Sequence, residues 1–85
     1  MRYYVKFIAN GKKRGRRIGY VNSGRKSEQE ILNEVFRIIN AFCEQRGYNS
    51  PYIRIYNSGE ETKFDVGSWS EFFSVRPKIL LEEAL

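Results

Sequence analysis

The chain has 85 residues, of which 41% are hydrophobic and 15% aromatic, so it is long enough for one domain with a modest core and is not disordered. The net charge of +5 is uneven, because residues 1–26 hold nine of the fifteen Lys and Arg and none of the ten Asp and Glu. The first third therefore carries +9 and the remainder −4. This asymmetry favours a nucleic acid, an acidic protein patch or a phosphorylated small molecule as partner, with improved solubility as the simpler alternative.

Residues 3–9 and 17–21 are predicted to form two strands of an antiparallel hairpin. Alternation along the first strand places on one face Tyr3, Val5, Phe7 and Ala9. It places on the other face Tyr4, Lys6 and Ile8. In the second strand, Ile18 and Tyr20 are expected to share a face, and Gly19 marks a bulge or a close approach.

The segment between these strands, residues 10–17, is here called the basic arm. It opens with the turn signal Asn10-Gly11 and contains no acid. Its five cations are Lys12, Lys13, Arg14, Arg16 and Arg17. A loop of this length exceeds the usual two to five residues of a hairpin, which favours a functional role over a purely connecting one.

A long helix is predicted from Ser27 to Gly47. Ser27 and Glu30 have the spacing of a capping box, and Gly47 has the position of a left-handed C-cap. Apolar residues recur at helical spacing along one broad face: Ile31, Leu32, Val35, Ile38, Ile39, Phe42 and Cys43. The opposite face mixes Arg37 with glutamates, which is unsuitable for a DNA recognition helix.

Two further strands are predicted over residues 52–56 and 62–66, joined by the turn Asn57-Ser58-Gly59. A second capping box at Ser68–Glu71 then predicts a short helix with Trp69, Phe72 and Phe73 on its inner face, and a final strand is the competing interpretation. Residues 78–85 are expected to form one more helical piece or a frayed tail, apolar enough to dock on the core or on a second subunit.

The predicted fold is therefore α+β, in the order ββαββ, with one long helix packed on an antiparallel sheet and a short C-terminal helix. Residues 1–76 are expected to form a single domain and residues 77–85 a C-terminal tail, through which a homodimer is an open alternative. The N-terminus lacks the apolar run of a signal peptide, no stretch has the about 20 apolar residues of a membrane span, and the chain has one cysteine. A cytoplasmic protein without a membrane partner is the expectation.

Catalysis is not expected. The chain has no histidine, so general-base and metal-ligand roles lack their most common side chain. Cys43 lies on the apolar helix face, where a thiol is usually a small core residue, and no imidazole exists to activate it. Residues 11–17 lack the Gly-Lys-Ser/Thr ending and the strand-to-helix context of a phosphate loop. No cofactor and no metal site is predicted.

The predicted activity is binding, and it has two components. The first is the basic arm, which can enter a DNA groove or follow a phosphate backbone. The second is the sheet face opposite the helix, where rings and cations can stack bases and hold the backbone of DNA or RNA. On this face we place Tyr4, Lys6, Tyr52, Arg54 and Tyr56, with Lys63 at the edge. Cross-strand tyrosine pairing that stabilises the sheet is the structural alternative.

Residues 65–73, Asp-Val-Gly-Ser-Trp-Ser-Glu-Phe-Phe, resemble a strand-turn-aromatic segment in small uncharacterised proteins of phages and conjugative elements. The resemblance implies an accessory protein of a mobile element and carries over no functional residue. Such accessories include DNA-binding proteins and anti-defence inhibitors, anti-CRISPR proteins among them. In the inhibitor case the basic arm would enter an acidic cleft or the nucleic-acid groove of a host protein, or the protein would sequester a nucleotide signal.

Overall fold

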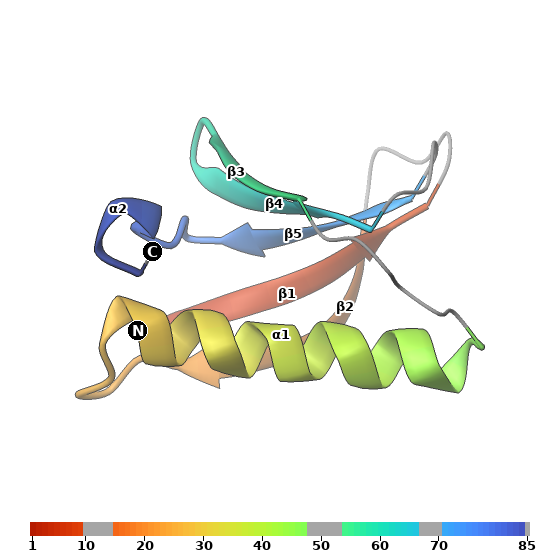
Figure 1. Ribbon diagram of the computed structural model, residues 1–85, viewed down its shortest axis with the longest axis horizontal. Coiled ribbons are helices and arrows are strands. Elements are labelled where there is room, and N and C mark those ends of the chain that lie inside the picture. The colour runs from red at the N-terminus through yellow and green to blue at the C-terminus, as the bar shows by residue number, and fades with distance from the viewer. Residues whose placement is uncertain (10–14, 48–53, 67–70, 85) are drawn as a thin grey trace.

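The computed structural model describes residues 1–9, 15–47, 54–66 and 71–84. One five-stranded antiparallel sheet, in the order β2-β1-β5-β4-β3, packs against one long helix (Figure 1). Its strands are β1 (Arg2–Ile8), β2 (Arg16–Asn22), β3 (Arg54–Ser58), β4 (Glu61–Asp65) and β5 (Phe72–Arg76). The helices are α1 (Glu28–Gln45) and the short α2 (Leu81–Ala84). The predicted α+β class and the ββαββ order of the first five elements are confirmed, and a fifth strand, β5, comes before the short C-terminal helix.

The helix α1 begins and ends as the sequence predicts. The Ser27 hydroxyl accepts from the Glu30 amide at 3.2 Å, and the Glu30 carboxylate accepts from the Ser27 amide at 3.5 Å, which completes the capping box. After the helix, Gly47 has a φ of 73°, the left-handed conformation that favours glycine. In the sequence, α1 connects β2 to β3, and these two strands form the opposite edges of the sheet.

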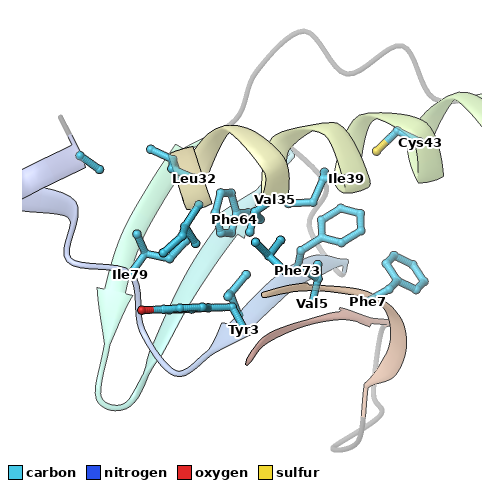
Figure 2. Close-up of a cluster of buried hydrophobic side chains, with 14 residues drawn as sticks. Tyr3, Val5, Phe7, Leu32, Val35, Ile39, Cys43, Phe64, Phe73 and Ile79 are labelled. Carbon is cyan, nitrogen blue, oxygen red and sulfur yellow. The ribbon is translucent and has the colours of Figure 1, made fainter. Parts of the chain in front are cut away.

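The core lies between α1 and the inner face of the sheet. Figure 2 shows side chains from both layers meeting there, with Phe64, Phe73 and Val5 near the centre. Phe64 also meets Phe36 of α1 edge-on, with ring centroids 5.7 Å apart. Cys43 is 3% exposed and belongs to this cluster, so the expectation of a core thiol is confirmed. Burial raises the pKa of its thiol, which disfavours the reactive thiolate.

The segment after β4 departs from the predicted helix. Phe72 and Phe73 lie in β5, so the competing strand interpretation is correct and the helical one is wrong for these two residues; Trp69 lies outside the described residues. The physical reason is tertiary: β5 pairs with β1 on one side and with β4 on the other, and so joins the two hairpins into one sheet. Burial of Phe73 at the centre of that sheet outweighs the local capping signal.

The end of the chain packs onto the core. Ile79 is fully buried and Ala84 is 7% exposed, while Leu80 between them is 44% exposed. In Figure 1, α2 lies close to the start of α1. The division at residue 76 into domain and tail stays a prediction. Within the described residues, no helix is long and apolar enough to cross a membrane.

The second strand contains the bulge that Gly19 was expected to mark. Pairing with β1 jumps from Val5↔Gly19 to Lys6↔Arg17, which leaves Ile18 as the extra residue. Ile18 packs against the core, whereas Tyr20 is exposed, so the prediction that these two share a face is wrong. A Cβ on Gly19 would lie 3.1 Å from Cγ2 of Ile38, so β2 and α1 also approach closely there.

Candidate nucleic-acid interface

The register of the five strands determines which side chains share the outer face, opposite α1. Residues directly paired across antiparallel strands point to the same side of the sheet. Tyr4 pairs with Tyr20 of β2 and with Arg76 of β5. Lys6 pairs with Arg17 of β2 and with Ser74 of β5. Further along the same face lie Lys63 of β4 with Arg54 and Tyr56 of β3.

Every aromatic ring on the described outer face has a cation against it. The Arg17 guanidinium lies 4.0 Å from the Tyr4 ring centroid, and that of Arg2 lies 4.9 Å from the Tyr20 ring. At the other end, Lys63 Nζ lies 5.2 Å from the Phe72 ring and the Arg54 guanidinium 5.1 Å from the Tyr56 ring. These distances are within the about 6 Å of a cation–π contact. The sheet face thus interleaves rings and cations, as predicted.

Charge divides this face into two halves. On β4, β3 and β5, acids pair with arginines: Arg54 lies 3.4 Å from Asp65, and Arg76 lies 3.2 Å from Glu61. On the outer face of β1 and β2, by contrast, three cations occur with no acid among the described residues there. We call this half the basic tyrosine surface, and its residues are Arg2, Tyr4, Lys6, Arg17 and Tyr20.

The basic tyrosine surface is held by contacts between its own members and by one hydrogen bond to Asn22. The rings of Tyr4 and Tyr20 are 6.3 Å apart at an interplanar angle of 52°. Arg2 Nε donates to Oδ1 of Asn22 at 3.2 Å, which positions the guanidinium beside Tyr20. Among the aromatic rings that the structure describes, Tyr20 is the most exposed, at 49%. The side chains of Arg2, Lys6 and Arg17 are also exposed, whereas Tyr4 is half-buried.

The predicted site residues fall into three groups. Tyr4, Lys6, Arg17, Arg54 and Tyr56 lie together on the outer face. Arg16 belongs to β2 and turns the other way, since it pairs with Phe7 and its guanidinium lies 5.8 Å from the Phe42 ring. The third group lies outside the described residues and consists of Lys12, Lys13, Arg14 and Tyr52.

Sequence reasoning missed Tyr20, Arg2 and Arg76 as members of this face. Tyr20 was placed with Ile18 because strict alternation ignores the bulge, and the signal that could have corrected this was Gly19. Arg2 precedes the predicted strand by one residue, although it shares parity with Tyr4 and Lys6. Arg76 could be placed only once β5 was known to be a strand beside β1.

Within the described residues, no group of three or more Cys, Asp and Glu gathers in a way that could hold a metal ion. Comparison of the chain with protein families, with curated proteins and with solved structures finds no match.

Proposed function

We propose that this protein is a non-catalytic nucleic-acid-binding protein whose contact surface is the basic tyrosine surface. The observation that carries the proposal is the concentration of three cations and two tyrosines on one half of an open sheet face, where the described residues include no acid, whereas arginines on the other half pair with acids. Phosphates are attracted by such unbalanced positive charge, and bases stack on exposed rings. A cytoplasmic location and an accessory role in a mobile element are part of the same proposal.

The basic arm adds to this surface in the proposal. It connects β1 to β2, so its cations Lys12, Lys13 and Arg14 follow directly on the strands that carry Lys6 and Arg17. Their contribution rests on the sequence alone.

The test measures fluorescence anisotropy of labelled single-stranded DNA, RNA and duplex DNA over a series of salt concentrations. Because neutralised phosphates release counterions, each contacting cation contributes about −0.7 to −0.9 to the slope of log affinity against log salt. The double variant Lys6→Gln/Arg17→Gln is therefore expected to bind more weakly and to flatten the slope by about 1.4 to 1.8.

The matched control is Arg37→Gln, which removes one exposed cation from α1 on the other side of the molecule and should change neither affinity nor slope. Absence of binding to all three nucleic acids at low salt would reject the proposal. That outcome would favour the inhibitor alternative, since exposed Tyr and Arg are also the side chains that dominate protein interfaces. Pull-down from a host lysate is the next experiment in that case.

A further inference from the structure

We infer that the ligand of the basic tyrosine surface is an unpaired nucleic-acid strand, DNA or RNA, and that its bases stack on Tyr20 and Tyr4. This inference rests on the proposed function and specifies the class of nucleic acid. It depends on three features of the described residues: the spacing of the rings, the breadth of the sheet face, and the position of the cations beside the rings.

The ring spacing does not suit a stacked duplex. The centroids of Tyr4 and Tyr20 are 6.3 Å apart, whereas successive bases of one duplex strand are separated by about 3.4 Å along the helix axis. Two neighbouring bases can each take one ring only if they first separate from one another. An unpaired strand does this at low cost, while a duplex would have to lose both stacking and pairing.

The sheet face is also too broad to bring its rings to paired bases. Five strands at about 4.8 Å spacing extend over roughly 19 Å, and the major groove is about 12 Å wide. A duplex lying on this face would present phosphates to Lys6 and Arg17, and its base edges would stay out of reach of Tyr4. The rings would then contribute nothing to duplex binding.

The cations are placed for a strand that stacks and is held at the same time. The Arg17 guanidinium lies over the Tyr4 ring at 4.0 Å, and Lys6 on β1 is the direct cross-strand partner of Arg17. A base that stacks on this guanidinium, or replaces it on the ring, would have its phosphate near a positive charge. Tyr20, 49% exposed at the edge strand, is the ring most accessible to a base. Its guanidinium neighbour, Arg2, reaches it from β1 and can move aside without a backbone change.

The test compares single-stranded DNA, single-stranded RNA and duplex DNA of about 16 nucleotides or base pairs, with wild-type protein and Tyr20→Ala. Loss of one base stack is expected to weaken single-strand binding about 5- to 150-fold and to leave duplex binding and the salt slope unchanged. Tyr20→Phe keeps the ring and is expected to bind as the wild type does. The DNA and RNA arms show which strand is preferred.

Leu80→Ala is the control, because Leu80 is a 44% exposed large apolar side chain that belongs to none of the sheet strands. It should retain single-strand affinity, and thermal unfolding should show that both alanine variants are folded. Equal or tighter binding to duplex, or no effect of Tyr20→Ala on single strands, would overturn the inference while leaving the proposed function in place. Failure to bind any nucleic acid would reject both.

Discussion

At the scale of single residues, Thr62 is a buried polar side chain with a defined structural task. It is fully buried on β4, where its hydroxyl donates to Oδ1 of Asn57 at 2.8 Å and accepts from the Ile79 amide at 2.7 Å. The second bond ties the segment after β5 to the sheet. A buried amide that loses its only strong acceptor is costly, so this hydroxyl matters more than its size suggests.

Thr62→Val keeps the shape of the side chain and removes the hydroxyl. We expect the free energy of unfolding to fall by about 1 to 3 kcal/mol and the Ile79 amide to exchange its hydrogen much faster. Thr62→Ser loses a methyl group instead, at a cost of about 0.8 kcal/mol, and should keep the Ile79 amide protected. Urea denaturation and hydrogen exchange measure the two effects. Unchanged protection of Ile79 in Thr62→Val would contradict this role.

Tyr3 predicts a loss of stability at alkaline pH. Burial raises the pKa of its phenol above the ordinary value of 10.0, and the carboxylate of Glu28 adds to the shift. Between the unfolded and the folded pKa the unfolded state binds fewer protons, so the free energy of unfolding falls as pH rises above about 10. Below that pH the contribution of Tyr3 is fully present.

Tyr3→Phe keeps the ring and removes the ionisation. Its free energy of unfolding should therefore fall less than that of the wild type between about pH 8 and about pH 11. The buried Cys43 thiol, whose pKa is also raised from 9.0, adds a loss of the same sign that is common to both proteins. Urea denaturation at the two pH values measures the difference. An identical alkaline loss in both proteins would show that Tyr3 has no part in it.

At the scale of elements, α1 is specified by its own sequence. Its buried residues recur with helical spacing, and its first turn has the complete Ser27–Glu30 capping box. Strand β5 is not specified by its own sequence in this sense: residues 72–76 form a strand because β1 and β4 lie on either side. A capping box and helical spacing thus accompany a helix at α1, whereas a similar capping signal before β5 is outweighed by strand pairing.

The N-cap of α1, Ser27, allows a prediction about the stability of this helix. Ser27→Ala removes the acceptor for the Glu30 amide and should lower the free energy of unfolding by about 1 kcal/mol, because that amide then has no partner within the helix. Ser27→Asp restores a capping oxygen and should return most of the stability. Chemical denaturation with an unchanged m-value measures this loss. Equal stability of Ser27→Ala and wild type would indicate that the cap contributes nothing.

At the scale of the whole molecule, the C-terminal segment completes the core. Ile79 is fully buried beneath β4, and the Leu80 amide donates to Oε2 of Glu28 at 3.1 Å, at the start of α1. Residues more than fifty positions apart are thus joined at one end of the sheet. For a chain of 85 residues, whose total stability is roughly 4 to 13 kcal/mol, such an anchor is a large fraction of the whole.

The adjacent pair Ile79 and Leu80 provides a matched test. Ile79→Ala should lower the free energy of unfolding by about 2 to 5 kcal/mol, since it removes a fully buried side chain. Leu80→Ala, at a side chain that is 44% exposed, should change it by no more than about 0.5 kcal/mol. Both are measured by urea denaturation. Similar effects of the two substitutions would mean that this segment does not belong to the core.

The sequence by itself determined the local elements and the outward direction of Tyr4, Lys6, Arg54 and Tyr56. Strand alternation and helix capping depend on neighbours within a few residues, so they can be read directly from the chain. Only the tertiary structure decided that residues 72–76 are a strand and that a bulge at Ile18 turns Tyr20 and Arg17 onto the outer face beside Tyr4. These features depend on pairing between segments that are distant in the sequence, and the free energy of that pairing cannot be inferred from neighbouring residues.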